Sequence, residues 1–391
     1  GGAAFLGMWW YCGVGSESRY LRFKRRHMKR ILSTIILCGA ALAAAAQPHE
    51  PAAPLAARVD SLSAEVAALR TESGTWQKIV ARLPRISGYV QTGFDYATDA
   101  SEFRLRRVRL NLQGDILRDR ILYRAQFELA APRIVDAYIE YRPFAQLNFK
   151  LGQYKIPFSI ENTDYAPLKF ELIEYPMALQ RMMGLSERIG DKSLSATGRE
   201  MGLTLYGGFL QRDGRRLVSY DVSIFNGAGI NTRDNNRSKD VAVRLTLRPL
   251  AGMQLSGSYY RGEFGPEYLL RERYGAGVCY DRGAVVLRGE WVGGRTGTPS
   301  VDGGPTGRFR SSGWYALGGW RPHAHWTLVA RYDTLLADTS AHASRQTNYT
   351  AGLTWQPLKW LRGQLNYTYE DYKISAAENR HVGSLLLSAI F

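Results

Sequence analysis

Sixteen short segments of alternating apolar and polar residues, from about Ile86 to Phe391, are the feature that most constrains the fold. Alternation places successive side chains on opposite faces of a strand. Each segment has roughly the nine to eleven residues that a tilted strand needs to cross a bilayer. Very short turns and longer polar loops alternate between the segments, as in transmembrane barrels. The sequence therefore predicts an all-β fold, a sixteen-stranded antiparallel transmembrane β-barrel over residues 85–391.

A recurring proline turn supports this prediction. Pro143, Pro249, Pro322 and Pro357 each lie between two alternating segments. Proline donates no ladder hydrogen bond, so it belongs at strand ends. These turns follow the fourth, eighth, twelfth and fourteenth expected strands, all even-numbered, as required if one rim carries the tight turns. The alternative is a soluble all-β protein with repeated hairpins.

The composition agrees with a barrel. Hydrophobic residues make up 45% of the chain, and no apolar run approaches the length of a membrane helix. Only every second residue of a barrel strand faces lipid, so the mean hydropathy of −0.27 resembles that of a soluble protein. The 23 tyrosines and nine tryptophans suit aromatic girdles at the two membrane interfaces.

The amino-terminal region predicts export. We interpret residues 1–27 as an upstream extension and residues 28–46 as a cleaved signal peptide, with a basic start, an apolar centre and an alanine-rich end. Lipidation at Cys38 is disfavoured because the preceding Leu37 is bulky. With the barrel, this signal predicts the outer membrane of a Gram-negative cell.

Residues 47–84 carry a helical pattern that ends at Pro84. The apolar positions follow a four-three spacing: Leu55, Val59, Leu62, Val66, Leu69, Trp76, Val80 and Leu83. This heptad seam favours a periplasmic coiled coil, which would tie several barrels together. A single amphipathic helix against the barrel mouth is the alternative.

The same alternation predicts which side chains point into the lumen. In the fourth strand, for example, it places Val135 outward and Asp136 inward. The basic residues assigned to the lumen in this way are Arg124, Lys150, Arg244, Arg288, Arg331 and Arg362. The acidic residues so assigned are Glu128, Asp136, Glu140, Asp221, Glu290, Asp333 and Glu370.

One strand breaks the alternation. The apolar residues of 103–105 share one parity and those of 108–112 share the other, so we expect a one-residue bulge near Arg106 and Arg107. With this bulge, Arg104, Arg107 and Arg109 form a water-facing stack. Guanidinium groups bind phosphate-like oxyanions through paired donors. Alternatively, these arginines pair with luminal carboxylates.

Three segments in order resemble the phosphate-selective porin O/P family: residues 103–110 with Gly114-Asp115, residues 135–139, and residues 152–162. The resemblance implies a sixteen-stranded trimeric porin whose third outer loop, here from about Lys155 to Gly198, folds into the lumen. Phosphate-selective members conduct phosphate or polyphosphate past a ladder of arginines. That property carries over to the arginines of 103–110 and to Lys155.

We therefore expect an outer-membrane channel for passive diffusion of small anions, with phosphate or polyphosphate as candidate solutes. The luminal charges are mixed, so general anion preference is the safer expectation. The alternative is a structural or adhesive barrel with a lumen plugged by the 155–198 loop. The last strand ends at Phe391 and resembles the signal that the barrel assembly machinery recognises.

Other function classes fit poorly. No nucleophilic serine elbow, zinc-binding helix or phosphate-cradling glycine loop occurs, so we predict neither an enzyme nor a cofactor or metal site. His323 and His325 flank a tight turn, so we interpret them as solvated residues at the barrel rim and not as metal ligands. The net charge of +16 is spread over strands and loops without a nucleic-acid-binding motif, so we expect no nucleic-acid partner.

Overall fold

The computed structural model describes residues 60–66, 83–185, 198–299, 307–341, 344–373 and 378–391. The chain forms two units, residues 1–81 and residues 82–391. In the first unit, residues 60–66 are helical. The remainder of the expected coiled coil before residue 83, the signal peptide and the upstream extension lie outside the described residues.

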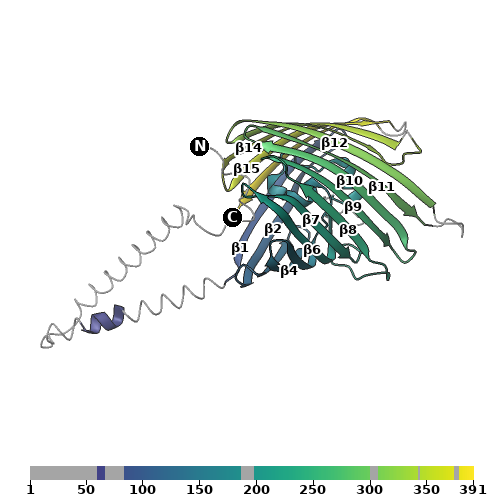
Figure 1. The fold of residues 1–391 in the computed structure, drawn as a ribbon. Helices are drawn as coiled ribbons and strands as arrows, with labels where there is room; N and C mark the ends of the chain where they lie inside the picture. The colour runs from purple at the N-terminus through teal and green to yellow at the C-terminus, as the bar shows by residue number, and fades with distance from the viewer. Residues whose placement is uncertain (1–59, 67–82, 186–197, 300–306, 342–343, 374–377) are drawn as a thin grey trace. The chain divides into compact units, whose positions relative to one another are not determined.

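The second unit is a closed antiparallel barrel of sixteen strands in sequence order (Figure 1), as the alternation predicts. The first eight strands are β1 (Arg85–Ala97), β2 (Ala100–Leu117), β3 (Ile121–Glu128), β4 (Arg133–Phe144), β5 (Leu147–Lys155), β6 (Arg199–Arg212), β7 (Arg215–Phe225) and β8 (Asp240–Leu247). The last eight are β9 (Met253–Phe264), β10 (Leu269–Arg282), β11 (Val285–Thr298), β12 (Gly307–His323), β13 (Trp326–Leu336), β14 (Arg345–Leu358), β15 (Leu361–Tyr372) and β16 (Arg380–Ile390).

The barrel closes where β1 pairs with β16. Gly88 and Phe391 exchange two backbone hydrogen bonds, each of 2.9 Å. A Cβ on Gly88 would lie 2.4 Å from the Arg109 carbonyl oxygen and 2.5 Å from the Phe391 ring. Glycine at this position therefore allows the last residue to cover the seam.

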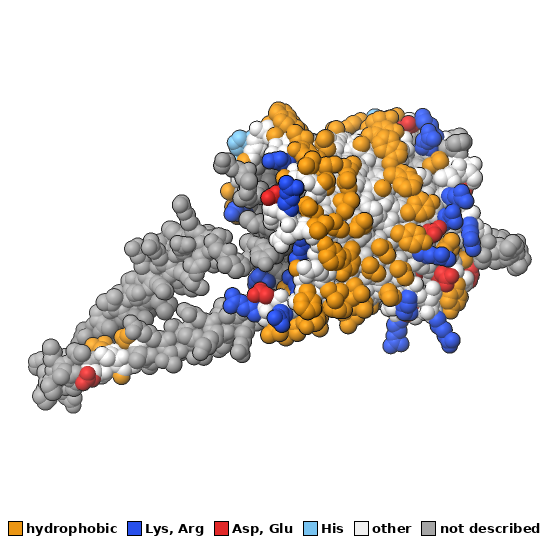
Figure 2. Space-filling view, in the orientation of Figure 1, with side chains coloured by type: hydrophobic (Ala, Val, Ile, Leu, Met, Phe, Trp, Pro, Cys, Tyr) orange, Lys and Arg blue, Asp and Glu red, His pale blue; other side chains and the backbone are white. Residues whose placement is uncertain are grey.

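Apolar side chains cover the outer surface because they occupy one parity of nearly every strand. Figure 2 shows them as a broad band on the visible face, with Lys and Arg side chains mainly at its two ends. Exposed apolar residues occur on strands all round the barrel, among them Leu151, Leu245, Leu287 and Leu385, which are 45–63% exposed. Such a surface suits contact with lipid. Among the described residues, no helix is long and apolar enough to span a membrane.

The β2 bulge is where the sequence predicts it. Gln91 pairs with Arg107 and Thr92 with Leu105, so Arg106 is the extra residue. A second bulge was not foreseen: Gln126 pairs with Asp136, whereas Phe127 pairs with Ile134. This bulge turns Val135 away from the outer surface, and Val135 is 0% exposed. The prediction that Val135 faces lipid is therefore wrong.

The connections also match the prediction. The four prolines lie at the ends of even-numbered strands: Pro249 follows β8, and Pro143, Pro322 and Pro357 are the second-last residues of β4, β12 and β14. The longest connection joins β5 to β6 and spans residues 156–198, close to the expected 155–198. We call residues 156–198 the inner loop, because the contacts of its described part, residues 156–185 and 198, are with inward-facing side chains of the barrel.

Candidate functional site

The inner loop has short helical elements in its described part: α3 (Ile160–Asp164), the 3-10 turn η1 (Pro167–Lys169) and α4 (Met177–Met183). Its apolar side chains form the main buried cluster of the molecule with inward-facing wall residues such as Tyr315 and Leu335. The helix α4 packs on β11, β12 and β13. The loop therefore has an apolar core of its own against one part of the wall.

The base of the loop is tied by hydrogen bonds to its own backbone. Lys155 donates from Nζ to the carbonyl oxygens of Asn162, at 2.8 Å, and Tyr165, at 2.6 Å. Asn162 donates from Nδ2 to the carbonyls of Ile156 and Gly198. Gly198 has φ of +60°, and a Cβ there would lie 2.1 Å from Leu185. These contacts fix where the loop leaves β5 and enters β6.

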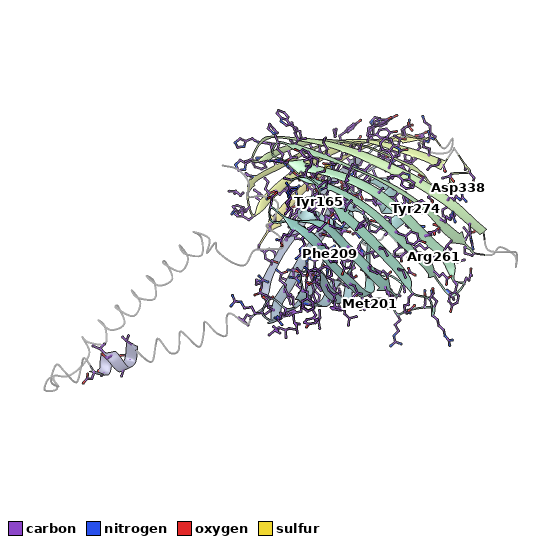
Figure 3. All side chains as sticks on the ribbon, viewed as in Figure 1. Tyr165, Met201, Phe209, Arg261, Tyr274 and Asp338 are labelled. Carbon is purple, nitrogen blue, oxygen red and sulfur yellow. The ribbon has the colours of Figure 1, made fainter. Side chains whose placement is uncertain are left out.

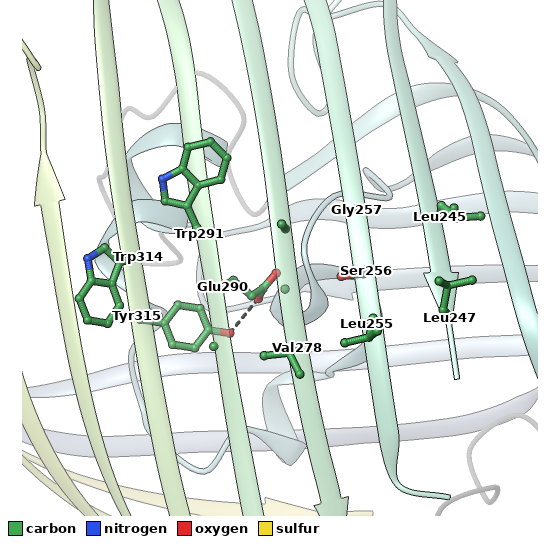
Figure 4. Close-up of a pocket in the computed structure, with 13 residues that line it drawn as sticks. Leu245, Leu247, Leu255, Ser256, Gly257, Val278, Glu290, Trp291, Trp314 and Tyr315 are labelled. Atoms are coloured by element: carbon green, nitrogen blue, oxygen red, sulfur yellow. Dashed lines mark hydrogen bonds between the residues drawn. The ribbon is translucent and has the colours of Figure 1, made fainter. Parts of the chain in front are cut away.

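Glu290 of β11 accepts the first free amides of α3. Its carboxylate receives the N–H groups of Ile160 at 2.7 Å and Glu161 at 3.2 Å, and the hydroxyl of Tyr315 at 2.8 Å. Figure 4 shows the Glu290–Tyr315 hydrogen bond. A carboxylate is favourable at a helix amino terminus, because the unpaired amides point toward it.

Arg288, two residues before Glu290, is the most enclosed cation of the site. Its side chain is 0% exposed and forms ion pairs with Glu161 at 2.7 Å and Glu171 at 2.8 Å. The guanidinium carbon lies 3.8 Å from the centre of the Tyr165 ring. One wall arginine thus joins both ends of the segment 161–171 to β11.

Arg244 of β8 holds the end of α3. Its two terminal nitrogens donate to the two oxygens of Asp164, at 3.2 and 2.5 Å, and Gln254 donates to the same carboxylate. Burial raises the pKa of Asp164, but the charge and hydrogen bonds of Arg244, with the bond from Gln254, lower it by more. The pKa of Asp164 therefore lies below its ordinary value, and the pair is ionised at neutral pH.

The stretch 168–175 is held by four further arginines. Arg362 of β15 donates to the carbonyl oxygens of Leu168 and Phe170. Arg331 of β13 donates to the Glu174 carbonyl at 2.7 Å. Arg104 and Arg106 of β2, on the other side of the β1–β16 seam, pair with the Glu174 carboxylate at 3.3 and 2.5 Å. The loop therefore bonds to β2 as well as to β8, β11, β13 and β15.

Six of the ten predicted cations contact the inner loop or its base. Five of them bond directly to the inner loop: Arg104, Arg244, Arg288, Arg331 and Arg362. Lys155 ties the base of the loop. The loop contacts of the five arginines agree with the inward direction predicted for them, and carboxylates and carbonyls of the loop accept hydrogen bonds from their guanidinium groups.

The water-facing stack predicted on β2 is wrong for two of its members. Arg107 is 2% exposed and donates to Gln91, and Arg109 is 1% exposed and pairs with Glu128 at 2.5 Å. Their guanidinium groups are covered because Gln91 of β1 and Glu128 of β3 accept hydrogen bonds from them. For Arg109, the alternative that the arginines pair with luminal carboxylates describes the structure.

The remaining two predicted cations keep more exposure. Arg124 of β3 is 33% exposed at its side chain and lies 3.7 Å from Asp136. Lys150 of β5 is 19% exposed and lies 3.6 Å from Glu140. Its Nζ also lies 5.0–5.4 Å from three tyrosine ring centres, those of Tyr138, Tyr154 and Tyr206.

Sequence reasoning missed several members of this network. Arg106 was assigned to the bulge without a direction, and Arg199 and Arg273 were not placed, although Arg199 pairs with Asp136 at 2.7 Å and Arg273 donates to the Met182 carbonyl. The loop carboxylates Glu161, Glu171 and Glu174 were not considered. Four acids between residues 161 and 174 were the available signal, because an acidic loop suits an arginine-rich wall.

Comparisons with known proteins agree with this architecture. A family model described as phosphate-selective porin O and P matches residues 86–389. The chain belongs to this porin family. It is therefore an outer-membrane porin, and porins are channel proteins. The comparison with curated protein sequences found no match.

Solved structures share the porin fold. An anion-selective porin from Comamonas acidovorans superposes with a TM-score of 0.62 at 13% identity, over 79% of this chain and 99% of its own. OmpF of Salmonella typhi, solved with daunomycin, gives 0.59 at 12% identity over 80% and 98%. The channel DcaP of Acinetobacter baumannii gives 0.55 at 13% identity over 79% and 97%.

Among the described residues of the porin, no group of three or more His, Cys, Asp or Glu side chains is placed to hold a metal ion. The tight-turn residues His323 and His325 have ring centres 5.1 Å apart.

Proposed function

We propose that this porin is a passive channel for small anions, with phosphate-like oxyanions among its solutes, and that the inner loop narrows the passage. The observation that carries the proposal is the uneven exposure of the luminal cations. Arg288, Arg244 and Arg331 have side chains only 0–5% exposed and hold the loop. Arg124 and Lys150 stay 33% and 19% exposed on β3 and β5.

We infer that solutes pass along the wall formed by β3–β5, because the loop elements pack mainly on β8–β15. Arg181 lies on α4 with an exposed side chain, whereas Met182 and Met183 beside it are buried. The proposed path thus runs between wall cations Arg124 and Lys150 and loop cation Arg181. Exposed cations attract anions into a narrow space where field lines are concentrated.

The partners of these cations set how tightly an anion is held. Asp136 lies near Arg124 and Glu140 near Lys150, so each cation is partly neutralised. A conducting site must bind its ion weakly enough to release it. Guanidinium suits phosphate through paired donors, and the ammonium of Lys150 acts as a point charge. This combination supports anion preference with fast release.

The comparisons support the same proposal. The name of the family refers to phosphate, and one structural neighbour is named as an anion-selective porin. We further propose that the chain is exported with a cleaved signal peptide at residues 28–46, that assembly machinery recognises Phe391, and that three copies assemble. The heptad spacing of residues 47–84 supports such assembly.

Reconstitution into planar bilayers tests the proposal. We expect stepwise open-channel currents, and a reversal potential in a KCl gradient that reports chloride preference. Added phosphate should reduce the chloride current by competition. Arg124→Glu with Lys150→Glu should shift the reversal potential toward cations, because two positive charges of the exposed path become negative. Arg118→Glu, at the β2–β3 turn with a 90% exposed side chain, is the control.

Two outcomes would contradict the proposal. Cation selectivity in the parent protein would refute anion preference. An absence of stepwise currents from a correctly folded barrel would instead support the plugged structural or adhesive barrel. Equal shifts from the double variant and from Arg118→Glu would show that Arg124 and Lys150 do not line the path.

A further inference from the structure

A row of arginines lies on the outward face of the barrel, near the rim that carries the longer loops. The strand register pairs Arg261 of β9 with Glu272 of β10, Glu272 with Arg295 of β11, and Arg295 with Arg310 of β12. Directly paired residues project to the same face. All three arginines are exposed, and Figure 3 labels Arg261 at this end of the barrel.

The row has an excess of positive charge. Glu272 pairs with Arg295 at 3.7 Å and accepts a hydrogen bond from Tyr259 at 2.9 Å. Three arginines and one glutamate therefore leave a net charge of about +2. Neighbouring strands are about 4.8 Å apart, so Arg295 and Arg310 are close enough to share one doubly charged group. Arginine binds phosphate through paired donors.

Aromatic side chains follow directly on the membrane side of the row. Tyr259 lies two residues before Arg261 on β9, and Tyr274 lies two residues after Glu272 on β10. The two tyrosines pair in register. The Tyr274 ring centre lies 5.6 Å from that of Trp291, and the Trp314 ring centre lies 5.0 Å from that of Tyr332. Aromatic girdles mark the headgroup level of a barrel. The arginine row is thus beside lipid headgroups and outside the channel.

An apolar groove begins four residues from the row, at a distance of about 13 Å along the strands. Its volume is about 650 Å³. The small residues Gly257, Ala276 and Gly289 line it together with Leu245, Leu255 and Trp291, and Figure 4 shows Leu245, Leu255 and Trp291 on neighbouring strands around Gly257. A Cβ on Gly257 would meet no atom within 4 Å. The groove is therefore open to an apolar chain from the bilayer.

We propose that this face binds a phosphorylated lipid of the outer leaflet. The headgroup phosphate lies on Arg261, Arg295 and Arg310, and one acyl chain lies in the groove over β8–β12. Both parts of the site lie on the same strands, with the charged part toward the headgroups and the apolar part toward the membrane interior. The choice of leaflet rests on the proposed function as an outer-membrane channel, because the longer loops of such barrels face the outside of the cell.

Lipid retention on the full-length protein in detergent tests this site. Native mass spectrometry would compare bis-phosphorylated lipid A, dephosphorylated lipid A and phosphatidylcholine as probes. We expect the phosphorylated glycolipid to be retained at least tenfold more than either comparison lipid. Arg261→Gln, Arg295→Gln and Arg310→Gln combined should abolish that preference.

The matched control removes three arginines from the opposite rim: Arg118→Gln, Arg120→Gln and Arg212→Gln, all at exposed positions. It should retain the lipid as the parent does. Gly257→Leu should fill the groove and weaken retention of lipid A several-fold, without changing competition by inorganic phosphate. This variant keeps the test decisive if the triple substitution fails to fold.

Equal retention of phosphorylated and dephosphorylated lipid would overturn the proposal, as would equal losses in the triple variant and its control. If millimolar inorganic phosphate removed all the lipid, the acyl chain would contribute nothing to retention. The arginine row would then be a site for free phosphate and not a lipid site. Channel conductance provides a separate readout. If currents are absent while lipid retention follows the predicted pattern, only the proposed channel function fails.

Discussion

Removal of Arg288 should release the inner loop from the barrel wall. In Arg288→Met, the carboxylates of Glu161 and Glu171 lose three charge-assisted hydrogen bonds of 2.7–3.0 Å while remaining in a buried cluster. Leaving a buried charge without its partner costs about 3–5 kcal/mol. At about 1.4 kcal/mol per tenfold change, the loop-released fraction should rise roughly 10²- to 4 × 10³-fold.

Cys279 offers a direct assay of this release. Its buried sulfur lies 3.5 Å from the Tyr165 hydroxyl of the loop, and it is the one cysteine beyond residue 46. With Cys12 and Cys38 replaced by serine, a small methanethiosulfonate reagent should label Cys279 slowly in the parent. The labelling rate should rise at least a hundredfold in Arg288→Met, and single-channel conductance should become larger and noisier.

Two further variants separate loop release from general damage. Arg181→Met removes an exposed charge from the same loop and should leave the labelling rate unchanged. Glu161→Gln and Glu171→Gln added to Arg288→Met remove the unpaired charges and should restore slow labelling in part. A labelling rate in Arg288→Met within threefold of the parent would refute the view that Arg288 anchors the loop.

Two other predictions concern the loop clamp and the barrel seam. The depressed pKa of Asp164 means that its pairing with Arg244 stabilises the loop above the ordinary carboxyl pKa of about 4. This contribution is lost as the pH falls through the lowered pKa that Asp164 has in the folded protein, so the current noise of the parent channel should rise below about pH 4. The Asp164→Asn channel should be noisy already at pH 7. A parent channel with constant noise down to pH 2 would contradict this. Gly88→Val should lower the temperature at which the barrel unfolds in SDS, because its side chain would collide with Phe391, whereas Gly257→Leu should not; equal effects would count against the seam packing.

Local alternation determined most of the barrel. Lipid contact requires every second residue of each strand to be apolar. The number of strands, the rim that carries the tight turns and the inward direction of side chains can therefore be predicted from short segments of sequence. The parity change between Leu105 and Val108 even located the bulge at Arg106. The bulge at Val135 escaped notice because its neighbour Ile134 is equally apolar, so either residue satisfies the pattern.

The tertiary structure decided which inward-facing cations meet water. Alternation places Arg124 and Arg288 on the same inner face, yet one side chain is 33% exposed and the other 0%. The difference comes from the inner loop, whose acids lie 80 to 127 residues from the arginines of β8 and β11 that they bind. Charge pairing over such separations depends on how the loop folds back across the wall, and that arrangement has no local signal in the chain.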